Sequence, residues 1–170
     1  MREIYIDTPC GSIKGVNEDG VNRFLGIRYA KAKRFEYAEE VTSWEGVYEA
    51  LDYGAAPIQM RTYDKYRNDN AHYEVEFLKN VDVEYSEDCL FLNVWAPEES
   101  ENCPVLVVIY GGGNMKGHSN EKEFDGTEFA KRGIIVVTLN YRVNIFGLMA
   151  IKELEKTDGR CGNFIYYDQH

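Results

Sequence analysis

Basic residues are scarce in this chain of 170 residues, which has 19 lysines and arginines against 29 aspartates and glutamates. Its formal net charge of -10 would repel the phosphates of nucleic acid and an anionic membrane surface. Long hydrophobic runs are also missing, because Val105–Tyr110 and Ile134–Val137 fall far below the ~18 residues that span a bilayer. We therefore expect a globular protein with no nucleic-acid or membrane partner.

Cysteine is sparse too, and no CxxC pair occurs. The four cysteines are Cys10, Cys89, Cys103 and Cys161. A zinc site needs close ligand pairs, so we expect neither metal nor cofactor. Free thiols are the favoured interpretation, and a disulfide stays open only for an exported protein. The acidic start of the chain does not have the pattern of a secretory leader, so we expect a cytoplasmic protein if Met1 is the true start.

The second half of the chain has the pattern of an α/β protein. Val105–Tyr110 and Ile134–Leu139 are apolar, β-branched runs, typical of parallel strands that helices cover on both faces. Between them, Asp125 can cap a helix, with Glu128 closing a capping box and Gly133 ending the helix. The succession of strand, glycine loop, helix and strand predicts an α/β fold.

The first half predicts shorter β structure. Residues 12–26 have apolar positions on both sides of an Asn-Glu-Asp-Gly turn at 17–20, which predicts a β-hairpin. Leu90–Trp95 is another candidate strand. Trp44 and Val47 are expected to pack in the interior.

The segment with the clearest chemical meaning is the run of three glycines after Tyr110. Glycine backbone can take positive φ and approach a ligand closely. The amides of Gly111, Gly112 and Gly113 can then point at a developing negative charge, as an oxyanion hole requires. A tight strand exit and a phosphate cradle remain open, although neither GxxxxGK[ST] nor GxGxxG is present.

Other segments surround these glycines in a fixed order. They are Phe24–Ala30, Glu87–Trp95, Asn140–Val143, Phe146–Leu148, Gly162–Phe164 and Asp168-Gln169. In order and spacing the set closely resembles the type-B carboxylesterase and cholinesterase family, over essentially the whole chain. The resemblance implies one incomplete domain over residues 1–170, the N-terminal portion of an α/β-hydrolase sheet with a small N-terminal β-hairpin region.

The resemblance also implies an activity, the hydrolysis of small uncharged carboxylic esters by a serine, a histidine and a carboxylate. The family's second and third loop glycines donate two oxyanion-hole amides, and they correspond to Gly112 and Gly113. Tyr110, Gly111 and Asn114 correspond to surrounding pocket positions. Asn114 stands where the family usually has an aromatic residue, so the acyl side of the pocket is expected to differ.

Two structural ion pairs are further implications of the resemblance. Arg142 is expected to pair with Asp168, and Arg34 with Glu87, so that the loops holding the oxyanion glycines are oriented. Neither pair is catalytic.

The chain also departs from the family pattern. Exported members with a cross-linked loop have a cysteine just before the glutamine that matches Gln59, and Pro57 holds that place here. Cys89 therefore lacks its usual partner, which favours a reduced, intracellular protein. Ile165 stands where the family typically has glycine.

The largest departure is the missing nucleophile. The five serines are Ser12, Ser43, Ser86, Ser100 and Ser119, and none lies in a GxSxG motif. Residues 117–121 come nearest, but they end in glutamate and lack the strand and helix that flank a nucleophile elbow. The family's serine, acid and histidine all follow the position of Gln169. We expect a chain that is inactive alone and that binds the missing C-terminal part of the domain or self-associates. The alternative is a truncated or non-catalytic binding relative of the family.

Some polar residues admit two interpretations. His118 and Ser119 could form a base and nucleophile, but adjacent residues seldom face each other productively, which favours loop roles. His72 and His170 are expected on the surface.

The segment before Cys89 is also ambiguous. Residues 63–76 are polar and rich in tyrosine, which predicts a long surface loop. Its tyrosines either line a substrate entrance or are ordinary loop residues; they are Tyr63, Tyr66 and Tyr73. The acidic residues between Glu74 and Asp88 could bind calcium, but they lack the EF-hand spacing, so a solvated face is favoured.

One strand is expected at an open edge. In the α/β-hydrolase sheet, the strand matching Val105–Tyr110 lies between the strand matching Ile134–Leu139 and the one that leads to the nucleophile. That last strand is missing from this sequence. Unpaired backbone groups along an apolar strand favour self-association.

Overall fold

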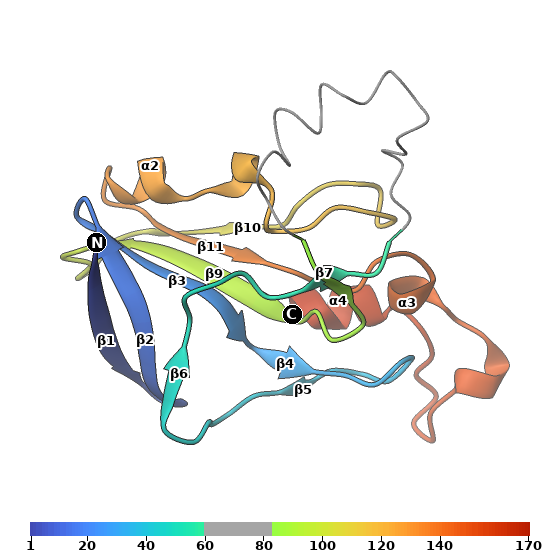
Figure 1. The fold of residues 1–170 in the computed structure, drawn as a ribbon. Coiled ribbons are helices and arrows are strands. Elements are labelled where there is room, and N and C mark those ends of the chain that lie inside the picture. Colours follow the sequence, from blue (N-terminus) through green and yellow to red (C-terminus); the bar gives the residue numbers. More distant parts are fainter. Residues whose placement is uncertain (60–82) are drawn as a thin grey trace.

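The main element of the structure, a computed structural model that describes residues 1–59 and 83–170, is a mixed seven-stranded sheet. Its strands are β1 (Arg2–Thr8), β2 (Gly11–Glu18), β3 (Val21–Arg28), β6 (Val47–Glu49), β9 (Phe91–Pro97), β10 (Val105–Val108) and β11 (Ile135–Leu139). The order is β1-β2-β3-β9-β11-β10, with β6 beside β2 (Figure 1). β10 runs parallel to β11, and β6 runs parallel to β2, whereas the other neighbours are antiparallel.

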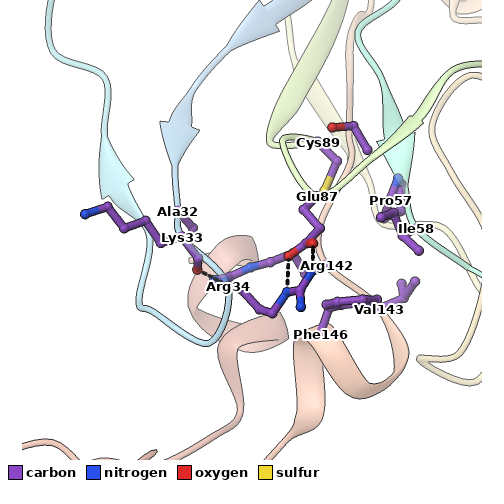
Figure 2. Close-up of a pocket in the computed structure, with 11 residues that line it drawn as sticks. Ala32, Lys33, Arg34, Pro57, Ile58, Glu87, Cys89, Arg142, Val143 and Phe146 are labelled. Carbon is purple, nitrogen blue, oxygen red and sulfur yellow. Dashed lines mark hydrogen bonds and ion pairs between the residues drawn. The ribbon is translucent and has the colours of Figure 1, made fainter.

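Smaller elements surround this sheet. Two ribbons are formed by β4 (Ala30–Lys31) with β5 (Glu39–Glu40) and by β7 (Ala56–Pro57) with β8 (Tyr85–Ser86). The described residues also form the helices α2 (Thr127–Ala130), α3 (Asn144–Leu148) and α4 (Phe164–Gln169), with 3-10 turns η3 (Lys122–Phe124) and η4 (Lys152–Leu154). Figure 2 shows the region where the ribbons approach α3, around Arg34, Glu87 and Arg142.

The predicted hairpin is confirmed as β2 and β3. Glu18 pairs with Val21 across the turn, and Asp19 and Gly20 take φ of 51° and 80°. Two successive positive φ values define a type I′ turn, whose twist matches that of the strands. The predicted strand Leu90–Trp95 is also confirmed, as β9.

The helix after the glycine loop differs from the prediction. The N-cap residue of α2 is Gly126, and a Cβ there would lie 2.7 Å from Val136. Asp125 accepts a hydrogen bond from the Thr127 N–H at 2.8 Å, but Glu128 pairs with Lys131, so the predicted capping box is wrong. Close packing of the helix start on the sheet has selected glycine there.

The predicted helix stop at Gly133 is confirmed. Its φ is 83°, and its N–H donates to the Ala130 carbonyl at 3.0 Å. The Ile134 N–H reaches back to the Phe129 carbonyl at 3.2 Å, which completes a Schellman motif.

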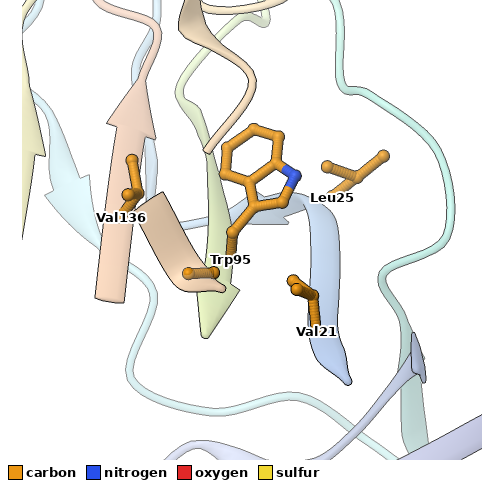
Figure 3. Close-up of a cluster of buried hydrophobic side chains, with 5 residues drawn as sticks. Val21, Leu25, Trp95 and Val136 are labelled. Carbon is orange, nitrogen blue, oxygen red and sulfur yellow. The ribbon is translucent and has the colours of Figure 1, made fainter. Parts of the chain in front are cut away.

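The sheet is buried on one face under α2. Trp95 is fully buried there with its neighbours Val21, Leu25, Ala130 and Val136 (Figure 3). A second cluster forms around Ile13, Phe24 and Ala50, with Trp44 and Tyr48 against it.

One predicted interior residue lies on the surface. Val47 is 47% exposed, so its predicted packing is wrong, whereas Trp44 packs as expected. Successive strand residues face opposite ways, and in β6 it is Tyr48 that points inward.

β10 is the outer strand of the sheet. It pairs with β11 on one side, and within residues 1–59 and 83–170 no strand pairs with its other side. Val105, Leu106 and Val107 are 59%, 39% and 56% exposed. The expected open edge is therefore confirmed. The helical cover of which an apolar strand pattern is typical is not present on both faces in the described part of the chain.

Part of the tyrosine-rich and acidic segment falls outside the described residues. The predictions affected concern Tyr63, Tyr66, His72, Tyr73, Glu74, Glu76 and Asp82. His170 is exposed, as predicted.

Candidate active site

A pair of stacked tyrosines supports the start of the glycine loop, which we define as residues 111–117. The rings of Tyr110 and Tyr141 are 4.1 Å apart and nearly parallel. The Tyr110 hydroxyl donates to the Tyr141 carbonyl at 2.9 Å, and the Tyr141 hydroxyl donates to the Tyr110 carbonyl. Burial raises the pKa of Tyr110 well above its ordinary value and that of Tyr141 to about 12, so both hydroxyls stay protonated at neutral pH. Tyr110 therefore supports the loop from inside the molecule, although the sequence placed it at the pocket.

The glycine loop presents backbone amides to the surface. Gly112, Gly113 and Asn114 have φ of 134°, 63° and 61°, and the two glycines are exposed. A Cβ at Gly112 would collide with the Lys116 carbonyl, so only glycine fits there. A Cβ at Gly113 would meet nothing within 4 Å, so this residue borders open space.

The amides of Gly112 and Gly113 have unused hydrogen-bonding capacity. Among the described residues, neither N–H donates to a protein group, whereas the Met115 N–H closes a turn onto the Gly112 carbonyl at 3.1 Å. An oxyanion hole requires amides that are fixed in direction and free to accept a new partner. The positive φ values of Gly112 and Gly113, and amides that have no protein acceptor in the described part of the chain, are compatible with such a role.

Three contacts fix the rest of the loop. The side chain of Gln59 forms hydrogen bonds with both backbone groups of Gly117, at 2.8 and 2.9 Å. The Asn144 N–H donates to the Asn114 carbonyl at 2.7 Å, and the Asn114 side-chain amide lies 3.3 Å from the Tyr166 hydroxyl. Asn114, expected at the acyl side of the pocket, is thus partly tied to α4. In the sequence, Gln59 stands out only because it matches a glutamine of the family, and no local pattern indicates its partner.

His118 and Ser119 are structural. Ser119 is buried, its N–H donates to the Asn140 side chain at 2.7 Å, and its hydroxyl accepts from the Asn93 amide at 3.2 Å. His118 is also buried, with its Nε2 3.9 Å from a Glu121 carboxylate oxygen. The Ser119 hydroxyl is part of a core polar network, in agreement with the favoured loop role.

Both ion pairs that the resemblance implied are present. Asp168 accepts from the Arg142 side chain at 2.6 and 2.8 Å and from its N–H at 3.0 Å, and the two side chains are 4% and 0% exposed. A further Arg142 N–H donates to the Glu36 carbonyl at 2.7 Å. Arg34 donates to Glu87 at 2.8 Å nearer the surface (Figure 2).

These ion pairs flank a small cavity. Its lining includes Arg34, Glu87, Cys89, Arg142 and Phe146 (Figure 2). The cavity holds about 10 Å³, roughly the room for one water molecule, which is too little for an ester substrate. It is therefore a structural space and not a substrate site.

In residues 1–59 and 83–170, the cysteines and the acids next to Cys89 form no arrangement typical of a catalytic site. All four cysteines are free, and burial raises the pKa of Cys89 to about 12, which makes this thiol unreactive at neutral pH. Asp88 pairs with Arg28, as Glu87 does with Arg34. Over residues 1–59 and 83–170, no three His, Cys, Asp or Glu side chains group as metal ligands, and no helix is long and apolar enough to cross a membrane.

Comparison with known proteins gives consistent matches. The profile of the Carboxylesterase family matches residues 2–170. The chain is 35% identical over 163 residues to the para-nitrobenzyl esterase of Bacillus subtilis, covering 92% of this chain and 31% of the relative. It is 33% identical over 181 residues to the bile salt-activated lipase of Rattus norvegicus, covering 96% of this chain and 26% of the relative.

Solved structures match in the same way. A PNB esterase aligns with a TM-score of 0.77 at 33% identity, covering 97% of this chain and 32% of the other. A thermophilic PNB esterase aligns with a TM-score of 0.79 at 34% identity, covering 97% and 33%. The chain thus spans about a third of the length of these proteins.

Proposed function

Because this chain belongs to the carboxylesterase family, we propose that it supplies the oxyanion hole of a serine-dependent carboxylic ester hydrolase. It corresponds to the N-terminal part of a type-B carboxylesterase, and its mixed sheet is an incomplete α/β-hydrolase fold. The observation that carries the proposal is the glycine loop. It begins three residues after the end of the outer strand β10 and presents two amides without a partner among the described residues.

The role of the loop is electrostatic. When a serine hydroxyl attacks an ester carbonyl, negative charge develops on the carbonyl oxygen. The N–H groups of Gly112 and Gly113 donate hydrogen bonds to that oxygen, and their fixed φ values avoid any reorganisation during the reaction. The resemblance to the family assigns a third amide to the residue after the nucleophilic serine, which this sequence lacks. The substrate class is a small uncharged carboxylic ester.

This chain is inactive alone under the proposal, because it contains no GxSxG serine. The test is hydrolysis of p-nitrophenyl acetate, with the Gly112→Pro variant as the control. We expect no turnover above that control and no labelling by a fluorophosphonate. A burst of nitrophenolate or stoichiometric labelling would show that this chain carries its own nucleophile, and would refute the proposal that the nucleophile lies outside it.

A second candidate function is that of a non-catalytic binding relative, and the missing nucleophile favours it. The coding DNA after codon 170 separates the two candidates. A downstream GxSxG in the same or a neighbouring frame supports the hydrolase. A stop codon with no such segment supports the binding relative.

The proposal includes partners and a location. The open edge of β10 favours self-association or binding of a C-terminal part of the domain. Free thiols, Cys89 among them, favour a cytoplasmic location. Titration in denaturant without reductant should find four thiols, and a count of two or none would exclude that location.

A further inference from the structure

We propose that Gln59 is a positioning residue for the glycine loop, holding Gly117 so that Gly112 and Gly113 keep their direction. The inference rests on the proposed function for its catalytic meaning. The positioning role itself requires only that the Gln59 side chain, which is distant in the sequence, sets the conformation of the loop.

The two ends of the glycine loop are in contact. Gly117 has a φ of 111°, and a Cβ there would lie 2.5 Å from both the Gly111 carbonyl oxygen and the Tyr110 ring. Gly112 likewise lies against the Lys116 carbonyl. The loop is therefore closed at its base, and a group that fixes Gly117 also fixes the point where the chain leaves Gly111.

Gln59 holds both backbone groups of Gly117. Its side-chain oxygen accepts from the Gly117 N–H at 2.8 Å, and its side-chain nitrogen donates to the Gly117 carbonyl at 2.9 Å. The same nitrogen donates to the Pro57 carbonyl at 3.1 Å. Pro57 is buried in β7, so the contact links the loop to a fixed part of the structure.

A neighbouring contact also holds the middle of the loop. The Asn144 side chain donates to the Ile58 carbonyl at 2.8 Å, and the Asn144 N–H donates to the Asn114 carbonyl at 2.7 Å. Loss of the Gln59 side chain would release Gly117 and leave the Asn144 contact to hold the loop alone, so this contact should open more often. We therefore expect a loosened loop and an otherwise folded chain.

The hydrogen-bonding pattern explains why an amide is needed. Position 59 faces one N–H and two carbonyl oxygens, so its side chain must both accept and donate. An ionised glutamate can only accept, and it would oppose the carbonyls of Pro57 and Gly117. A protonated glutamate has one donor and restores part of the pattern. Gln59→Glu should therefore behave as a pH-dependent version of the native side chain.

Hydrogen exchange on the full chain, read by mass spectrometry at residue resolution, tests the proposal. The reporters are the amides of Met115 and Asn144, which donate to the Gly112 and Asn114 carbonyls. In Gln59→Met we expect both amides to exchange about tenfold faster, since the three hydrogen bonds of the Gln59 side chain, two of them to Gly117, are lost. The amides of β2 and β3 should keep their native rates.

Asn22→Leu is the matched control. Like Gln59, Asn22 uses both atoms of its side-chain amide. The oxygen accepts from the Asn17 side chain at 2.7 Å, and the nitrogen donates to the Pro97 carbonyl at 3.4 Å. Asn22 lies in the hairpin, away from the glycine loop. This variant should loosen hairpin amides and leave Met115 and Asn144 unchanged.

Gln59→Glu separates positioning from general stability. At pH 8 it should loosen the Met115 and Asn144 amides as Gln59→Met does, and at pH 5 it should regain protection. Each exchange rate is compared with that of the native chain at the same pH. Effects of pH that act through the neighbouring groups His118 and Glu121 are common to both chains and therefore cancel. Native protection in Gln59→Met would overturn the proposal. Uniform loosening of the whole chain in both variants at both pH values would do so too. No ester turnover is involved, so failure of the proposed hydrolase activity leaves this result standing.

Discussion

Arg142 can be buried in this chain because its partner is buried with it. Asp168 forms two side-chain hydrogen bonds with the guanidinium, and a third Arg142 N–H is taken up by the Glu36 carbonyl. The guanidinium also lies 5.3 Å from the Phe164 ring. The pair joins the segment after β11 to α4, and both segments contribute to the support of the glycine loop.

Removing one partner of this pair should be costly. Asp168→Ala leaves a buried guanidinium without its carboxylate, so we expect the free energy of unfolding to fall by ~3–5 kcal/mol. Asp158→Ala is the control, because that aspartate pairs with Arg160 and is half exposed. Chemical denaturation measures both variants. Equal midpoints would show that the Arg142 pair contributes no more than a surface contact.

The buried thiol of Cys89 should make stability depend on alkaline pH. Burial raises its pKa from 9.0 to about 12. Below pH 9 both folded and unfolded chains keep the proton, and above it only the unfolded chain loses it. The free energy of unfolding should therefore fall by ~1.4 kcal/mol per pH unit between pH 9 and 12 on account of this group.

Comparison with Cys89→Ala isolates that contribution. The variant retains Tyr141 and the other groups that titrate above pH 9, so its free energy of unfolding should fall less steeply than that of the native chain. Denaturation at pH 8, 9, 10 and 11 gives both slopes. Parallel slopes would contradict the assignment.

Elements whose conformation depends only on neighbouring residues could be predicted from the sequence, and elements that depend on distant contacts could not. The hairpin could be predicted because Asp19 and Gly20 supply the positive φ values of its turn by themselves. The start of α2 could not, because Gly126 is required by contact with Val136, which lies on another strand. An apolar pattern such as that of β10 indicates that a strand is suited to burial, but it does not say what covers it.

The outer edge of β10 should drive association of the chain. Its exposed valines and leucine are uncharged, and its second side has no partner strand among the described residues. Light scattering and dye binding should show self-association at micromolar concentration, and Val107→Lys should reduce it by placing a charge on the edge.

Val47→Lys is the control for this experiment. Val47 is similarly exposed, but it lies in β6, which pairs with β2 and is not adjacent to β10 in the sheet. It should leave association unchanged. A monodisperse native monomer with a cooperative melt would contradict the prediction.

Some parts of the candidate site could be predicted from the sequence and others could not. Gly112, Gly113 and the two ion pairs follow from motifs that are contiguous in the sequence or shared with the family. The contact between Gln59 and Gly117 joins residues 58 positions apart, and neither residue is unusual in its own segment. Only the folded chain brings these two residues together. The sequence could therefore indicate which glycines carry the loop amides, but not which side chain supports the loop.

At the level of the complete fold, the central claim is that these glycines serve ester hydrolysis. The most direct test is a chimera in which residues 2–170 replace the matching third of the Bacillus subtilis para-nitrobenzyl esterase. We predict that it hydrolyses p-nitrophenyl acetate. Gly112→Pro removes one donor N–H and cannot keep the φ of 134°, so it should lower kcat by at least ~10²–10³ in a chimera that still melts cooperatively. A cooperatively folded chimera that is inactive, or whose activity Gly112→Pro leaves unchanged, would contradict the claim.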